Sequence, residues 1–180
     1  MLCPYDLQVG SDVIASAERT HPMVLRGGRD LPSSSYNPHV PVPASCDRPL
    51  EDPPARAAVL AYRNDLARVR AFTTRQAERA GLSDRRLRDL VIAVGELAAN
   101  TLAHTSGPGM LAIWATPEEI ICQVQDTGHI EDPVTGRLRP DPADLGGGRG
   151  LWVVNQVCDL VQIRTGRRET QIRLHMRLPA

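Results

Sequence analysis

The chain has 180 residues, of which 42% are hydrophobic, and its formal net charge is zero. This length is sufficient for one full hydrophobic core with an appendage, and the neutral balance argues against bulk binding of nucleic acid or of an acidic membrane surface. No apolar run reaches the roughly 18 residues of a membrane span, and the N-terminus lacks a signal pattern, so we expect a cytoplasmic protein.

The basic residues and the cysteines exclude several further classes of site. All 21 basic residues are arginine. The absence of lysine excludes a P-loop of the G-x-x-x-x-G-K-[ST] type. The four cysteines, Cys3, Cys46, Cys122 and Cys158, are scattered without a C-x-x-C pair. We therefore expect free buried thiols in a reducing compartment rather than a zinc site or a disulfide framework.

The beginning of the chain reads as a short folded segment followed by a linker. Residues 2–5 predict the end of a strand, and residues 11–19 predict a short helix with Ser11 as its N-cap. Residues 26–54 are rich in Gly, Pro and Ser, which is typical of a semi-extended linker. The chain therefore divides into a segment 1–25, a linker 26–54 and a main domain 55–180.

The main domain alternates helical and extended patterns. Asn64 and Ser83 are the expected N-caps of its first two helices, and Gly81 is expected to end the first of them. The pattern predicts, in chain order, a strand 57–62, helices 65–80 and 83–104, strands 110–116 and 120–125 in a hairpin, a helix 151–157, and strands 160–164 and 171–177. Strands gathered on one side of helices predict an α+β fold, a two-layer sandwich with a mixed, mostly antiparallel sheet and helices on one face.

Two polar residues lie one turn apart on the second helix of this domain. Glu96 and Asn100 are spaced i, i+4 and project from one flank, beside an apolar stripe that includes Leu90, Val94 and Thr101. Side-chain oxygens in such a pair suit Mg²⁺, which takes its remaining ligands from water and substrate phosphates. On this pair alone, a solvated polar flank is the favoured interpretation.

A second motif follows the strand 120–125. Asp126-x-Gly128 places a carboxylate at the end of a strand, where it can accept a hydrogen bond from an exocyclic amine such as adenine N6 and repel a guanine carbonyl. Gly128 would allow a flat base to approach the backbone. Taken alone, Asp-x-Gly is a common turn.

A glycine-rich run precedes the helix 151–157. Gly146, Gly148 and Gly150, with Arg149 and Leu151, follow a long proline-rich loop, 129–145. Backbone amides at a helix N-terminus form an anion site, and an arginine there can clamp phosphate oxygens. A hinge without ligand contacts is the alternative, whereas a dinucleotide-binding G-x-G-x-x-G spacing is absent.

Taken together, these motifs carry a resemblance to a known superfamily. E-L-A-A-N on a helix, D-x-G after a strand and G-x-G-L before a helix resemble the N, G1 and G2 boxes of the GHKL, or Bergerat-fold, histidine-kinase-like ATPases, over about residues 57–178. W-x-x-N-Q-x-C-D and R-L-H-M-R are similar to segments of actinobacterial anti-sigma regulatory Ser/Thr kinases. C-P-Y-D and T-H-P near the N-terminus resemble the closing part of a MEDS sensory domain.

The resemblance implies a role for each motif. Asn100 would be the Mg²⁺ ligand, and Glu96 would orient or deprotonate the nucleophile. Asp126 would bind adenine N6, Gly128 would lie below the base, and Thr170 would lie near the adenine. The phosphates would lie along Gly146, Gly148, Arg149, Gly150 and Leu151. One position departs from the pattern, because Ile130, preceded by His129, replaces the second glycine of D-x-G-x-G.

The implied function is ATP-dependent and regulatory. The cofactors would be ATP and Mg²⁺, and the reaction would phosphorylate a serine or threonine of a STAS-type anti-anti-sigma partner. The alternative is a non-catalytic module that sequesters a sigma factor or a STAS protein. A sensor histidine kinase lacks support because no phospho-acceptor helix precedes the domain. A homodimer is neither supported nor excluded, and nucleic acid and membrane are not expected as partners.

Overall fold

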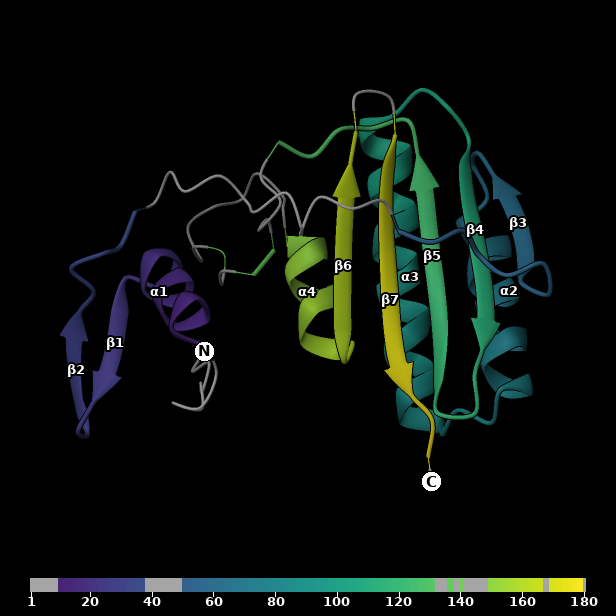
Figure 1. The fold of residues 1–180 in the computed structure, drawn as a ribbon. Helices are drawn as coiled ribbons and strands as arrows, with labels where there is room; N and C mark the ends of the chain where they lie inside the picture. Colours follow the sequence, from purple (N-terminus) through teal and green to yellow (C-terminus); the bar gives the residue numbers. More distant parts are fainter. Residues whose placement is uncertain are drawn as a thin grey trace. The chain divides into compact units, whose positions relative to one another are not determined.

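The computed structural model describes residues 10–37, 50–131, 136–137, 140, 149–166 and 169–179 (Figure 1). The predicted strand end at residues 2–5 and the glycines Gly146 and Gly148 lie outside this part of the chain. The chain divides into two units, Met1–Arg48 and Pro49–Ala180, whose boundary falls within the expected linker. Among the described helices, none combines the length and apolarity that a membrane span requires.

The first unit contains a helix and a hairpin. Helix α1 spans Ser11–Thr20, as predicted, but its N-cap is Gly10, and Ser11 is the first helical residue. Strands β1 (Met23–Arg26) and β2 (Arg29–Pro32) pair in an antiparallel register, although residues 26–32 were expected to belong to the linker. Gly27 and Gly28 have φ values of +56° and +77°, as a two-residue type I′ turn requires. This Gly-Gly pair is a hairpin signal, which the composition-based interpretation of the segment missed.

The second unit contributes three helices. Helix α2 spans Leu66–Arg79, α3 spans Asp84–His104 and α4 spans Arg149–Val157. The N-cap of α2 is Asp65 rather than the expected Asn64, because the Asp65 carboxylate accepts a hydrogen bond of 2.7 Å from the Arg68 amide. Gly81 ends the α2 segment with a φ of +78°, and Ser83 occupies the N-cap position of α3, both as predicted.

These helices lie on one face of a five-stranded sheet (Figure 1). The strands are β3 (Ala58–Tyr62), β4 (Gly109–Ala115), β5 (Glu119–Asp126), β6 (Leu160–Thr165) and β7 (Thr170–Arg177), in the order β3-β4-β5-β7-β6. All four described pairings in this sheet are antiparallel, including the predicted β4–β5 hairpin. The α+β two-layer fold is therefore confirmed, with a sheet that is antiparallel throughout its described pairings.

The core lies between the sheet and the helices. Helix α3 buries one continuous stripe, and β5 is buried on both faces from Ile120 to Val124.

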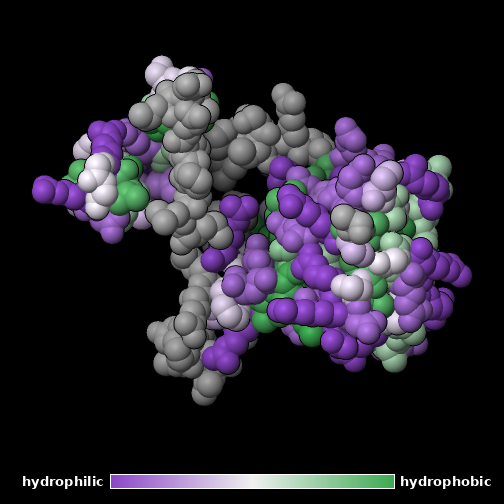
Figure 2. All heavy atoms as spheres, turned by 90° about the horizontal axis from the view of Figure 1, so that it is seen from below, coloured by the Kyte–Doolittle hydropathy of each residue, from purple (hydrophilic) through white to green (hydrophobic). Residues whose placement is uncertain are grey.

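On the face away from the helices, Arg173 donates to Gln123 Oε1 and to the Glu51 carbonyl, as the segment before β3 crosses the sheet (Figure 1). The Arg173 guanidinium also lies 5.2 Å from the Trp114 ring centroid, so this tryptophan packs against an arginine on that face. Figure 2 shows hydrophilic residues over most of the visible surface of this unit, with hydrophobic residues between them.

Two cysteines of this unit are free thiols in apolar surroundings. Cys122 on β5 is fully buried, and Cys158, after α4, is partly buried. Burial raises the pKa of Cys158 to about 12, against the opposing effect of the Arg86 charge. Burial also raises the pKa of Cys122 well above its usual range. The prediction of free buried thiols is confirmed for these two residues.

These thiols are expected to make the protein less stable in alkali. In the unfolded chain they ionise from about pH 8.5, whereas in the folded protein they stay protonated, so the unfolded state loses protons first. The unfolding free energy should fall by about 1.4 kcal/mol per thiol per pH unit once the pH exceeds that value. Urea denaturation under reducing conditions at pH 8 and pH 10 measures the slope. A Cys122→Ala variant should show a smaller slope, and an unchanged slope would contradict the assignment.

Candidate functional site

A cavity of about 260 Å³ opens where α3, α4 and one end of the sheet meet. It gathers five of the residues that the sequence motifs single out: Asn100, Asp126, Gly128, Leu151 and Thr170. These residues come from four different elements and from the turn after β5. The remaining lining residues are His104, Thr105, His129, Ile130 and Ile172.

Asp126 is held by two neutral donors at the end of β5. Its Oδ1 accepts a hydrogen bond of 2.8 Å from the Gly128 amide, and its Oδ2 accepts one of 2.7 Å from the Thr101 hydroxyl. Each carboxylate oxygen has a further lone pair, so the group can accept another hydrogen bond in the cavity. The carboxylate is thus oriented as a hydrogen-bond acceptor.

Gly128 and Thr170 form the neighbouring wall. A Cβ atom at Gly128 would lie 3.0 Å from Asp126 Oδ1 and 3.1 Å from Thr105 Cγ2, so a larger residue would crowd the Asp126 carboxylate. The Gly128 carbonyl accepts a hydrogen bond of 2.9 Å from the buried Thr170 hydroxyl. Thr170 is also the register partner of Asp126 between β5 and β7. Strand pairing therefore brings these three residues together.

The position that departs from the sequence pattern is tied to the β6–β7 connection. The Ile130 amide donates to Thr165 Oγ1 over 3.1 Å. His129 Nδ1 lies 3.1 Å from Thr165 Oγ1 and 3.1 Å from the Gly166 carbonyl oxygen. Residues 129 and 130 are thus anchored through their backbone and side chain, where the sequence pattern expects a glycine-containing loop.

Glu96 and Asn100 meet the first turn of α4. A Cβ atom at Gly150 would lie 2.8 Å from Glu96 Oε2 and 3.6 Å from Asn100 Oδ1. Both side chains are partly buried, so this flank is more than a solvated surface. Their carboxylate and amide oxygens are the hard donors that Mg²⁺ accepts, and the pair therefore fits this ion. Asn100 lines the cavity, whereas Glu96 is not among the residues that line it.

The glycine-rich run is only partly within the described residues. Arg149 and Gly150 are the first two residues of α4, and Leu151, which is buried, lines the cavity. The α4 N-terminus therefore begins beside the polar flank of α3. His104 is exposed at the end of α3 and also lines the cavity.

Two hydroxyl residues of this region were missed as functional residues. Thr101 was assigned to the apolar stripe of α3, although its hydroxyl contacts Asp126. Tyr62, at the end of β3, donates a hydrogen bond of 3.0 Å to Thr101 Oγ1. A threonine within an apolar stripe, next to a candidate ligand, was a signal for Thr101. Tyr62 carried none, because only the fold brings β3 to this place.

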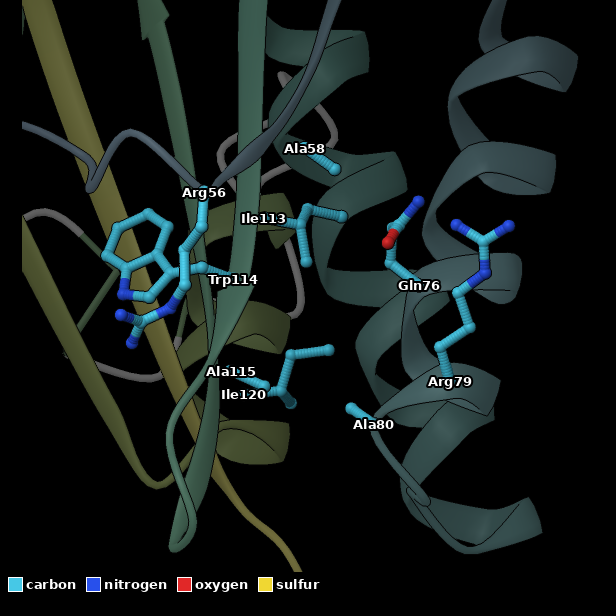
Figure 3. Close-up of a pocket in the computed structure, with 9 residues that line it drawn as sticks. All are labelled: Arg56, Ala58, Gln76, Arg79, Ala80, Ile113, Trp114, Ala115 and Ile120. Atoms are coloured by element: carbon cyan, nitrogen blue, oxygen red, sulfur yellow. The ribbon is translucent and has the colours of Figure 1, made fainter.

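A second hollow, of about 200 Å³, lies between α2 and the sheet (Figure 3). Ile113 and Ile120 point from the sheet toward α2, which carries Gln76 and Arg79, whereas Trp114 lies on the opposite side of β4 (Figure 3). Among the described residues, those that line this hollow include no carboxylate and no residue of the three motifs. The motif residues that line a cavity within the described part of the chain therefore line the first one.

The chain is similar to known proteins in sequence and in structure. A solved structure that the chain matches is the Acinetobacter baumannii histidine kinase AdeS, at 13% sequence identity and a TM-score of 0.42, over 69% of this chain and 70% of that chain. No curated protein matches the sequence. The family model described as the histidine kinase-like ATPase domain matches residues 59–176, which is well over half of the chain. The chain therefore belongs to the histidine kinase-like ATPase domain family.

Proposed function

We propose that the chain binds ATP with Mg²⁺ in the cavity between α3, α4 and the sheet, and transfers the γ-phosphoryl group to a serine or threonine of a STAS-type anti-anti-sigma protein. The observation that carries the proposal is the convergence of two chemically different ends in one place. A fixed carboxylate acceptor, Asp126, lines the cavity together with Asn100, and the side chains of Asn100 and Glu96 lie against Gly150 in the first turn of α4.

The Asp126 end fits an adenine. Asp126 can accept a hydrogen bond from the exocyclic amine of adenine, and it would meet the guanine carbonyl as one acceptor facing another. Gly128 has no side chain, so a flat ring can approach its backbone, and Ile130 and Ile172 supply apolar contact from the lining.

The α3–α4 end fits the phosphates. Asn100 would hold Mg²⁺, with Glu96 beside it, and the ion would neutralise phosphate charge during transfer. The amides of the first turn of α4 and the positive end of its dipole favour anionic oxygens. Gly150 allows this turn to approach the α3 flank, because any side chain there would meet the Glu96 carboxylate.

Glu96 is the candidate general base. In the transfer, the hydroxyl oxygen of the protein substrate bonds to the γ-phosphorus, and the bond from that phosphorus to the β–γ bridging oxygen breaks as ADP leaves. Glu96 would accept the hydroxyl proton. The Glu96 side chain is partly buried and lies one turn from Asn100, so it is close to the proposed phosphate site and apart from the proposed adenine site.

A direct experiment tests the proposal. Purified chain is titrated with ATP and Mg²⁺ in a calorimeter, and is then incubated with γ-labelled ATP and candidate STAS proteins. We expect saturable ATP binding and label on a serine or threonine of one STAS protein. Absence of ATP binding would contradict the nucleotide site, whereas binding without transfer would contradict only the kinase reaction.

The hydrogen bonds that hold residues 129 and 130, which follow the D-x-G motif, favour a second candidate function. His129 and Ile130 are tied to Thr165 and Gly166, where the family pattern has a glycine. A stiff loop here fits a non-catalytic module that sequesters a sigma factor or a STAS protein with ATP as a conformational ligand. In that case ATP would alter partner affinity in a pull-down of the purified proteins, and no label would be transferred.

Gly150→Ala is expected to impair transfer more than ATP binding. The new methyl group would lie 2.8 Å from Glu96 Oε2 and displace the carboxylate, while the base end of the cavity stays unchanged. Misplacing a catalytic group by a fraction of an ångström to an ångström costs about 10- to 100-fold in rate. The labelled-ATP assay and calorimetry measure the two effects.

Gly95→Ala is the matched control for that variant. It adds the same methyl group within a helix, but there the nearest atom is Arg70 Nε at 3.6 Å, the end of a flexible side chain. Transfer should stay at the wild-type rate. If both variants lost activity equally, the close approach of α4 to Glu96 would have no special role.

A further inference from the structure

We propose that Tyr62 is a positioning residue for base recognition, acting on Asp126 through the Thr101 hydroxyl. The inference rests on the proposed nucleotide site and deepens it, because it assigns the discrimination of the base to a chain of three residues from β3, α3 and β5. Tyr62 does not line the cavity and would not touch the nucleotide.

The three side chains form a directional chain of hydrogen bonds. Tyr62 donates to Thr101 Oγ1 over 3.0 Å, and Thr101 donates to Asp126 Oδ2 over 2.7 Å. A threonine hydroxyl has one proton and can also donate to the carbonyl four residues earlier, here Leu97 O at 3.2 Å. The Tyr62 proton occupies an acceptor site of Thr101, and so favours the orientation that points the Thr101 proton at Asp126.

The Tyr62 and Thr101 hydroxyl groups are buried, so the direction in which each one donates its proton matters for Asp126. Tyr62 is 4% exposed and Thr101 is fully buried, so water cannot substitute for a lost partner. Burial raises the pKa of Tyr62, the Thr101 hydrogen bond lowers it in part, and the negative charge of Asp126 raises it again. Tyr62 is therefore a neutral phenol at pH 7, with a proton available to donate.

A glycine on the neighbouring strand makes room for the tyrosine ring. Tyr62 and Gly109 are register partners between β3 and β4. A Cβ atom at Gly109 would lie 2.2 Å from Tyr62 Cζ and 2.4 Å from its hydroxyl oxygen. The strand pair thus leaves space for the ring in the position from which its hydroxyl reaches Thr101.

The consequence for base recognition is the direction in which the Asp126 carboxylate presents its free lone pair. The Gly128 amide and the Thr101 hydroxyl each bond one oxygen of Asp126, and together they fix the rotation of the carboxylate. If Thr101 turned its proton to Leu97, Asp126 would keep only the Gly128 bond and could rotate. The hydrogen bond to an exocyclic amine would weaken, whereas contacts to the rest of the nucleotide would not change.

The experiment compares two nucleotides on the full chain by calorimetry with Mg²⁺: ATP, and the purine riboside triphosphate that lacks the 6-amino group. Tyr62→Phe keeps the ring and removes the donor. We expect its affinity for ATP to fall about three- to tenfold, the range for one neutral hydrogen bond, with the affinity for the second nucleotide unchanged. In an Asp126→Asn background, the same substitution should have no further effect.

Two variants of Thr101 and one control complete the test. Thr101→Val should reduce the preference for ATP at least as much as Tyr62→Phe, and Thr101→Ser should restore it by returning the hydroxyl. Thr73→Val is the matched control, because Thr73 is equally buried and, among the described residues, its hydroxyl donates to the Val69 carbonyl on α2 and to no other group. It should leave the preference unchanged.

The outcomes separate this inference from the proposed function. Equal losses for both nucleotides in Tyr62→Phe, or a further loss in the Asp126→Asn background, would overturn the role of Tyr62 while the ATP site stood. Wild-type protein that binds neither nucleotide would overturn the site itself and this inference with it. If Tyr62→Phe failed to fold, Gly109→Ala would take its place, because the added methyl group would displace the Tyr62 hydroxyl; an unchanged preference for ATP in that variant would overturn the role of Tyr62.

Discussion

Replacing Glu96 with glutamine is expected to reduce phosphoryl transfer by about 10²- to 10⁴-fold, which is the usual contribution of a positioned general base. Glutamine has nearly the same shape but cannot accept the hydroxyl proton. ATP affinity should change little, because Glu96 is not among the residues lining the cavity and the proposed Mg²⁺ ligand, Asn100, is intact. Single-turnover transfer of label to the STAS partner, alongside calorimetry with ATP, measures both quantities.

The control for this variant is Glu78→Gln. Glu78 is an exposed carboxylate on α2, so its loss changes the net charge of the protein equally without touching the site. Its transfer rate should match that of the wild type. Full activity in Glu96→Gln would show that this carboxylate is not the base, and loss of ATP binding would place it in nucleotide binding instead.

Asp126→Asn is expected to weaken ATP binding by about 10- to 100-fold, the range for a hydrogen bond to a charged group. The carboxylate now accepts from both the Gly128 amide and the Thr101 hydroxyl. An asparagine has one oxygen only, so its amino group must face one of these two neighbours. The side chain would then turn, and a donor would meet the donating amine of the base.

Calorimetry with ATP and with GTP tests this prediction. Replacing an acceptor by an amide that also donates should narrow the difference between the two nucleotides, because a guanine carbonyl can accept from the new amino group. The control is Gln125→Asn, because Gln125 lies just before Asp126 on β5 and its side-chain amide donates to Glu169 instead. Unlike Gln125→Glu, this substitution adds no charge. Unchanged ATP affinity in Asp126→Asn would remove Asp126 from base recognition.

The regular elements of the second unit could be predicted because their signals are local. Helix α3 shows its buried stripe in the spacing of Leu90, Val94 and Ala98, and the β4–β5 hairpin has a short connection between two apolar runs. The errors were also local. Asp65 rather than Asn64 caps α2, and the choice between two adjacent capping residues depends on which side chain reaches the Arg68 amide. The Gly27–Gly28 turn was missed because residues 26–54 were assigned to a linker from their content of Gly, Pro and Ser, without regard to the order of the residues.

The candidate site divides in the same way. Glu96 and Asn100 are one turn apart on a helix, and Asp126 and Gly128 are two residues apart, so spacing could single these residues out, whereas their expected roles came from the three motifs together and the family they resemble. Thr165 and Tyr62 could not be found, because they are distant from those motifs along the chain and carry no motif of their own. Thr170 was found only through resemblance to a family, although the structure places it against Gly128.

By itself, the sequence determined the periodicities that form helices and strands, and the chemical groups available at each motif, because both depend on neighbours within a few residues. The tertiary structure decided which of these groups meet. The register of β5 with β7 sets Asp126 opposite Thr170, and the packing of α4 on α3 brings Gly150 to Glu96 and Asn100. The pairing of β3 with β4 sets Tyr62 over Gly109, from where its hydroxyl reaches Thr101. These contacts depend on strand register and helix packing across the whole domain, which no local pattern encodes.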